Sequence, residues 1–170
     1  VSGKGVPASM TMAVAVNLFR SVAKEGFTPA QIANRLNDTL SFDNENSIFV
    51  TMFIAEIDLE TGRMDFCNAG HNPPIIVNNQ LKPGNPNRAY YIDMESNAPV
   101  GLWPELKYIG ESIDNIKGHM LLIYTDGLTE AENEEREQHG EERLLELMSK
   151  HEFVNAESTV NKILGDAATH

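Results

Sequence analysis

Helical patterns occupy both ends of this 170-residue sequence, and strand patterns fill the region between them. Pro7 suits the first position of a helix, where its missing N–H costs nothing, and Gly26 suits the end. The residues over Ala8–Val16 are apolar on nearly every side, which predicts a helix buried in a core. Thr28 and Gln31 form a capping box that starts a second helix. The predicted helices cover Pro7–Gly26, Thr28–Leu40, Glu141–Lys150 and Glu157–Ala168.

The central region changes to β-branched, aromatic and alternating residues, which predicts strands. Gly62 separates the first two as a hairpin, and the composition of Asn78–Asn87 is that of an exposed loop. The sequence shows neither a repeat nor a linker, so we predict one α+β domain over residues 1–170 with a largely antiparallel sheet. The predicted strands are Phe49–Leu59, Arg63–Ala69, Ile75–Val77, Ala89–Asp93, Leu106–Ile113 and His119–Tyr124.

Charge and hydropathy exclude several classes of function. The chain has 13 Lys and Arg against 25 Asp and Glu, a net charge of −12 without a basic cluster, which argues against nucleic-acid binding. The purest apolar run, Met120–Tyr124, is far shorter than the roughly 18 residues of a membrane span and predicts a buried strand. We therefore expect no membrane contact by this segment and a cytoplasmic location, although other domains of a longer protein could anchor it. The single cysteine, Cys67, fits a reducing compartment.

A glycine-lysine loop, Ser2–Pro7, stands where the first predicted helix begins. Free backbone N–H groups at a helix start favour an anion or a tight turn. The loop lacks the spacing of a Walker A motif, because Gly5 follows Lys4 directly. The alternative is a turn that merely starts the helix, and this segment alone favours that alternative.

A carboxylate follows the most apolar predicted strand, in the sequence Thr125-Asp126-Gly127. An ionised carboxylate at such a place is costly unless it is paired, hydrogen-bonded or bound to a cation. A hard cation such as Mg²⁺ or Mn²⁺ would need further carboxylates from elsewhere in the fold. The alternative is an aspartate that caps its own turn, and the segment alone leaves both interpretations open.

Two other segments favour structural interpretations. His71 lies in the turn Asn68–Pro74 and could be a ligand or a general base, but the remaining histidines are scattered, which favours a structural role. The segment Glu130–Glu146 is rich in glutamate, which predicts a solvated flap and helix face. The scattered histidines are His119, His139, His151 and His170.

Taken in order, four segments resemble the bacterial branch of the protein phosphatase 2C-like (PP2C-like) superfamily of metal-dependent phosphatases. That branch is typified by the stage II sporulation E phosphatase and by the phosphatases that regulate sigma-B. The resemblance implies an α-β-β-α sandwich, of which this chain would be a fragment without the N-terminal and C-terminal strands. The segments that carry it are Val1–Ala8, Phe49–Phe53, Asn68–Pro74 and Tyr124–Ala131.

The resemblance also implies a site with two Mn²⁺ or Mg²⁺ ions, which hold a hydroxide that attacks a phosphoserine or phosphothreonine. Asp126 matches the metal-ligating aspartate of the family, and Val1 matches the residue whose backbone carbonyl approaches a metal. The loop residues that shape the site correspond to Gly3, Lys4, Gly5 and Gly127. No residue of this chain is assigned a catalytic role beyond metal binding.

The family's other acidic ligands would stand before Val1, on an earlier strand and beyond the last helix, outside this sequence. We therefore expect the chain alone to hold metal weakly or not at all and to be inactive. A longer protein would be a serine/threonine protein phosphatase acting on a phosphorylated anti-sigma-factor antagonist in stress or developmental signalling. The alternative is a degenerate, non-catalytic module that binds a partner or oligomerises, for instance as a homodimer.

Overall fold

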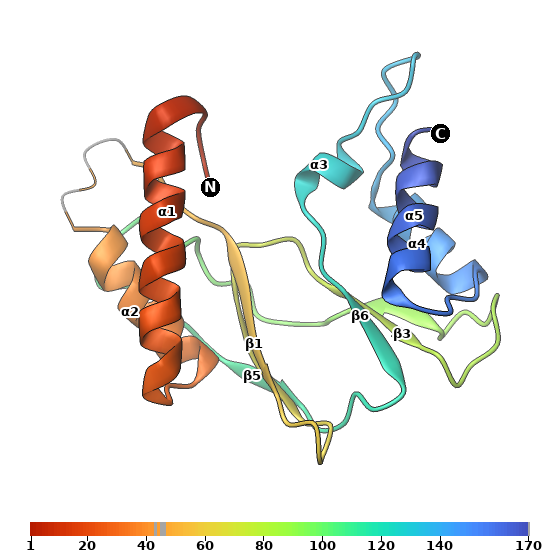
Figure 1. Ribbon diagram of the computed structural model, residues 1–170, viewed down its shortest axis with the longest axis horizontal. Coiled ribbons are helices and arrows are strands. Elements are labelled where there is room, and N and C mark those ends of the chain that lie inside the picture. The colour runs from red at the N-terminus through yellow and green to blue at the C-terminus, as the bar shows by residue number, and fades with distance from the viewer. Residues whose placement is uncertain (43, 45–46, 170) are drawn as a thin grey trace. The chain divides into compact units, whose positions relative to one another are not determined.

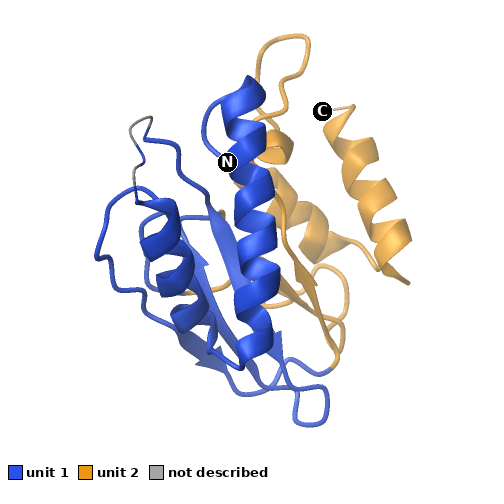
Figure 2. Cartoon of the chain, turned by 60° about the vertical axis from the view of Figure 1, so that its left-hand side comes forward, with its two compact units in different colours: residues 1–71, 94–117 blue, residues 72–93, 118–170 orange. Residues whose placement is uncertain are grey.

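The computed structural model describes residues 1–42, 44 and 47–169, and the histidine at position 170 lies outside them. The chain forms two compact units, each made of helices and one antiparallel sheet (Figures 1 and 2). Unit 1 comprises Val1–His71 and Met94–Lys117, and unit 2 comprises Asn72–Asp93 and Gly118–His170. The α+β class is confirmed, and the described residues form two three-stranded sheets, where the strand pattern predicts one sheet and the family resemblance implies two.

Unit 1 contains a sheet with the strand order β1-β2-β5. The hairpin between β1 and β2 is confirmed, with Met52 opposite Ala69 and Ile57 opposite Met64. Gly62 has a φ of +82° in the turn, a backbone conformation that glycine adopts without strain. The helix α2 packs on β1 and β2 over a buried core. The elements are α1 (Gly5–Val22), a 3₁₀ turn (Ala23–Glu25), α2 (Pro29–Leu40), β1 (Met52–Ile57), β2 (Met64–Ala69) and β5 (Glu111–Ile113).

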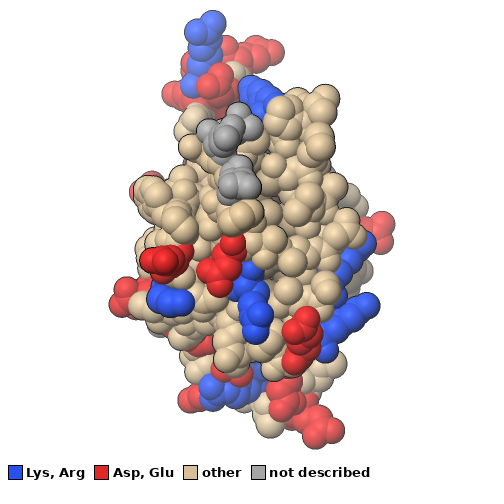
Figure 3. Space-filling view, turned by 90° about the vertical axis from the view of Figure 1, so that its left-hand side faces the viewer, with Lys and Arg blue, Asp and Glu red and all other residues tan. Residues whose placement is uncertain are grey.

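The expectation that the first helix is buried in a core is wrong. Ala15 and Val22 are the buried residues of α1, whereas Val6 is 71% and Met10 65% exposed. A helix with apolar side chains on every side is buried only where neighbours cover all of them, and within unit 1 its main packing partner is α2. Figure 3 shows this helical side, where much of the surface carries no charge.

By length and composition, the helical stretch Gly5–Glu25 would also suffice to cross a membrane, contrary to the expectation that no segment does. Only 17% of its most apolar window is buried. Core helices of soluble proteins meet the same criterion, so this property alone assigns no membrane contact.

The capping box of α2 offers a local test of stability. Thr28 Oγ1 accepts from the Gln31 N–H at 3.4 Å, and Gln31 Oε1 accepts from the Thr28 N–H at 2.9 Å. Thr28→Ala removes one of these bonds, so we expect the free energy of unfolding in urea to fall by about 1 kcal/mol. The matched control is Thr39→Ala on the surface of the same helix, which should leave stability unchanged or slightly raised. An equal loss of stability in both variants would show that the side-chain cap at Thr28 does not stabilise the fold.

Unit 2 contains a sheet with the order β4-β3-β6, covered by α4. Ile75 and Val77 of β3 are fully buried and pack in one core with Leu144 and Met148 of α4. The helix Glu141–Lys150 has the predicted bounds, and the last helix begins and ends one residue before its prediction. The elements are β3 (Ile75–Asn78), β4 (Ala89–Tyr91), β6 (His119–Leu122), α3 (Asp126–Thr129), α4 (Glu141–Lys150) and α5 (Ala156–Ala167).

Candidate functional site

A buried tyrosine, Tyr124, lies two residues after the end of β6 and two residues before Asp126. Tyr124 is 6% exposed and belongs to the core of unit 2. Its hydroxyl donates to Glu141 Oε1 at 3.5 Å, and burial raises the pKa of Tyr124, so this hydroxyl stays protonated. The chain is therefore anchored at Tyr124, and the next three residues, including Asp126, emerge at the surface.

The carboxylate of Asp126 is exposed at the start of the single-turn helix α3. Its Oδ1 accepts from the Gly127 N–H at 2.8 Å, and its backbone carbonyl accepts from the Glu130 N–H at 2.7 Å. The first bond is the local turn contact that the structural alternative requires. Because one bond leaves several lone pairs of the carboxylate accessible, the same side chain can also bind a cation.

Ser2 fastens the N-terminal loop to the segment before β1. The Ser2 N–H donates to the Phe49 carbonyl, and the Phe49 N–H donates to Ser2 Oγ, both at 2.8 Å. Gly3 and Gly5 have φ angles of +80° and +76°, which glycine adopts without strain. Lys4 is extended and exposed at the N-cap of α1. The glycines therefore have a backbone role, and their part in shaping a site stays a prediction.

The predicted site residues fall into two groups that do not form one cluster within either unit. Among residues 1–42, 44 and 47–169, no three His, Cys, Asp or Glu side chains come together as a metal-binding group. Ca²⁺ and Mg²⁺ ions are held by about six or more oxygen ligands, with water completing the set. One carboxylate does not fit a two-ion centre. Unit 1 holds Val1, Gly3, Lys4 and Gly5, and unit 2 holds Asp126 and Gly127.

His71 closes the turn after β2. Its N–H donates to Asn68 Oδ1 at 2.9 Å, and its carbonyl accepts from Asn68 Nδ2 at 2.8 Å. Its ring nitrogen Nδ1 lies 3.4 Å from the hydroxyl of Thr51. These contacts fit the structural role that the sequence favours for this histidine.

Cys67 lies in the core of unit 1 and is 1% exposed. Burial, with a smaller contribution from the negative charge of Glu111, raises the pKa of the thiol to about 11. Since the thiolate is the nucleophilic form, Cys67 is a packing residue at neutral pH.

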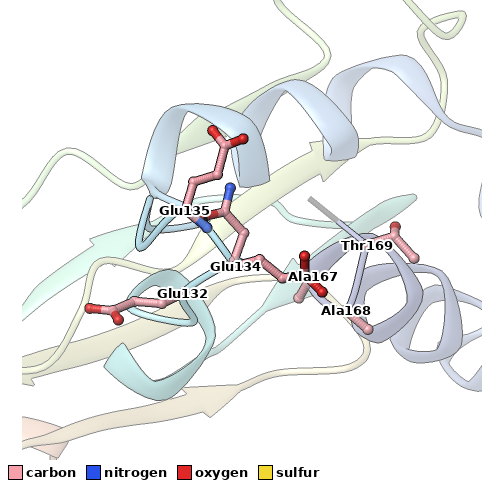
Figure 4. A pocket seen from close by; sticks show the side chains of 7 residues that line it. Glu132, Glu134, Glu135, Ala167, Ala168 and Thr169 are labelled. Carbon is pink, nitrogen blue, oxygen red and sulfur yellow. Dashed lines mark hydrogen bonds between the residues drawn. The ribbon is translucent and has the colours of Figure 1, made fainter.

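The glutamate-rich segment is solvated, as expected, and every glutamate between Glu130 and Glu146 is exposed. A cavity of about 580 Å³ separates part of this segment from the end of α5. In Figure 4 the carboxylates of Glu132 and Glu135 at this cavity point away from each other. They do not converge on one point, so they do not form a metal site.

Unit 2 contains a polar cluster that was not predicted from the sequence. His139 is 3% exposed, and its Nε2 lies 2.9 Å from Asp166 Oδ2 on α5. Arg143 of α4 donates from Nε to the same oxygen at 2.8 Å. The cluster joins the segment before α4 to both helices. These three residues are separated by up to 27 positions, so no local motif marks them.

This cluster predicts a pH dependence of stability. The hydrogen bond from Arg143, and then that from His139, lowers the pKa of Asp166 from 3.8 to about 2. Because the lowered pKa belongs to the folded chain, the ionised Asp166 stabilises the fold above pH 3.8, and this contribution disappears as the pH falls towards 2. The side chains of Asp166 and Arg143 are 21% and 43% exposed, so solvent screens their interaction. We therefore expect the pair to contribute about 1 kcal/mol to the free energy of unfolding.

The test compares urea unfolding of the wild type and Asp166→Asn between pH 7 and pH 2. We expect the wild type to be more stable by about 1 kcal/mol at neutral pH, and the difference to vanish at the acid end. A difference that is independent of pH would contradict this assignment.

Comparisons with known proteins agree with the fold. The model of the stage II sporulation protein E (SpoIIE) family matches residues 1–170. The phosphoserine phosphatase RsbU of Bacillus subtilis is 27% identical over 135 residues, which cover 79% of this chain and 38% of RsbU. The chain spans less than two fifths of the length of the curated relatives that it matches.

Two solved structures show the same fold. The structure of the PP2C phosphatase domain with a fragment of the regulatory domain of SpoIIE from Bacillus subtilis has a TM-score of 0.76 at 18% identity, over 97% of this chain and 46% of that one. The SiaA PP2C domain of Pseudomonas aeruginosa has a TM-score of 0.74 at 15% identity, over 99% of this chain and 67% of that one. The chain therefore has a PP2C-type fold and belongs to the SpoIIE family.

Proposed function

We propose that this chain is part of a serine/threonine protein phosphatase that removes phosphate from a phosphoserine or phosphothreonine protein. The observation that carries the proposal is the SpoIIE family match along all 170 residues, with Asp126 exposed two residues after the buried Tyr124. RsbU and RsbP, two relatives of the chain, are named phosphoserine phosphatases. The proposed protein substrate is a phosphorylated anti-sigma-factor antagonist, as the resemblance to the phosphatases that regulate sigma-B implies.

The proposed activity requires Mn²⁺ or Mg²⁺ and more carboxylates than the described residues bring together. RsbX, a structural neighbour at 19% identity, was solved in complex with magnesium. Here Asp126 contributes one exposed carboxylate, and Ser2 and the two glycines fix the backbone of the loop that carries Val1. The chain alone is therefore metal-poor and inactive, and the residues that precede Val1 or follow position 170 in a longer protein complete the site.

The first experiment titrates the 170-residue chain with MnCl₂ in a calorimeter and measures phosphate release from a phosphoserine protein. We expect weak or no binding and no turnover. Tight binding with turnover would show that the chain supplies all the ligands and would overturn the requirement for outside carboxylates.

A second candidate is a non-catalytic module that signals by binding a partner. The observation in its favour is that the described residues hold no cluster of metal ligands. The sequence around this chain in the longer protein decides between the two. An aspartate immediately before Val1 and an Asp-Asp segment beyond the last helix support the phosphatase, and their absence supports the binding module.

A further inference from the structure

Arg88 is among the most deeply buried side chains of the molecule, although it carries a charge. It is 2% exposed and directly precedes β4 in unit 2. Its N–H donates to the Asn85 carbonyl at 3.0 Å, and its own carbonyl accepts from the Asn78 N–H at 2.7 Å. A buried guanidinium is costly unless its surroundings compensate the charge. The compensation that the structure provides is incomplete.

The guanidinium uses one of its two terminal nitrogens for hydrogen bonds. Nη1 donates to the carbonyls of Ser149, at 3.3 Å, and of His151. Both acceptors lie at the C-terminal end of α4, the negative end of the helix dipole. These two bonds engage both hydrogens of Nη1.

The other edge of the guanidinium is unused. Nε is buried without a hydrogen-bond partner, and among the described residues no carboxylate forms an ion pair with Arg88. Nε and Nη2 present parallel N–H groups, a fork that matches two oxygens of a carboxylate or phosphate. The edge left free is therefore the one best suited to an oxyanion.

Arg88 also lines a cavity of about 240 Å³ in unit 2. Lys82 is a second positively charged residue in its lining, which also includes Asn79 and Gln80. Glu152 is the one acidic residue among the lining residues. Two cations against one carboxylate make this lining locally basic on a chain whose net charge is −12.

We propose that this cavity binds a small oxyanion, a carboxylate or a phosphate group, through the Nε–Nη2 edge of Arg88 and the ammonium of Lys82. Because Nε is buried, the anion has to displace lining side chains as it enters, which favours a small ion over a large one. The negative charge of Glu152 in the same lining weakens the binding. This inference is independent of the proposed phosphatase activity.

The test follows the Nε–H resonance of Arg88 by NMR in the ¹⁵N-labelled chain. Sodium phosphate and sodium acetate are added in separate titrations, with sodium chloride at matched ionic strength as the reference. A saturable shift with phosphate alone assigns the site to phosphate, and a shift with acetate alone assigns it to carboxylates. Saturation with both supports a general oxyanion site. Shifts that match those in chloride would overturn the proposal.

Two variants test whether the anion binds at this local site or responds only to the net charge of the chain. Both variants leave Arg88 in place. Lys82→Gln should weaken the binding about threefold, and Glu152→Gln should strengthen it by a similar factor. Lys24→Gln is the matched control, because it removes the same charge from an exposed residue of unit 1. Equal weakening by Lys82→Gln and Lys24→Gln would overturn the site.

Discussion

Replacing Asn37 with leucine is expected to lower the free energy of unfolding by about 2–5 kcal/mol. Asn37 lies on α2 and is completely buried. Its Oδ1 accepts from the Gly101 N–H at 2.9 Å, and its Nδ2 donates to the Trp103 carbonyl at 3.0 Å. Leucine has nearly the same size but no polar atom, so both backbone groups lose their partner. The buried Gly101 N–H costs about 1–3 kcal/mol when it is left without a hydrogen bond, and the carbonyl of the more exposed Trp103 adds a smaller cost.

Urea unfolding of unlabelled protein, followed by circular dichroism, measures this effect. Asn17→Leu on the exposed surface of α1 is the matched control and should change stability by less than about 0.5 kcal/mol. The hydroxyl of Tyr108, which also donates to Asn37 Oδ1, keeps its bond to the Pro99 carbonyl at 3.1 Å and is not counted in the loss. A difference between the variants below about 1 kcal/mol would show that water reaches the two backbone groups.

The elements predicted correctly are those whose causes lie close together in the sequence. The capping box at Thr28 joins residues three positions apart, and the hairpin turn at Gly62 needs one glycine in a left-handed conformation. The bounds of α4 follow from an apolar period that a single packed face explains. Local chemistry determined these elements, and therefore the sequence alone was enough to find them.

The predicted strand over Leu106–Ile113 shows where local chemistry fails. Only its last three residues form a strand. The Tyr108 N–H donates to Asn34 Oδ1 at 3.2 Å, and the Ile109 N–H donates to Asn97 Oδ1 at 2.8 Å. These side chains satisfy backbone groups that a neighbouring strand would otherwise bind. Since Asn34 lies on α2, 74 positions from Tyr108, no local pattern announces the contact.

The functional residues also differ in whether the sequence reveals them. Asp126 could be identified from the sequence because an apolar strand leads directly into Thr-Asp-Gly. The environment of Arg88 could not, because its hydrogen-bond acceptors lie more than 60 positions away at the end of α4. An arginine that follows an exposed loop of Asn, Pro and Gly residues is expected to be solvated, and only the tertiary structure reveals that it is buried.

Replacing Asp126 with asparagine should abolish most phosphatase activity in any longer polypeptide that contains this chain and shows Mn²⁺-dependent turnover. Asparagine keeps the oxygen that accepts from the Gly127 N–H, so the turn and the free energy of unfolding should be retained. The variant loses the negative charge that a hard cation requires.

We expect phosphate release from a phosphoserine protein to fall by about 10³-fold or more, which corresponds to about 4 kcal/mol of transition-state stabilisation. Asp93→Asn is the control, since Asp93 is also exposed in unit 2, and its activity should remain near that of the wild type. Calorimetric titration with MnCl₂ shows the cause of the lost activity. If Asp126→Asn loses metal affinity and Asp93→Asn keeps it, Asp126 is a metal ligand. Near-normal turnover in Asp126→Asn would remove this aspartate from the site and leave its bond to Gly127 as its function.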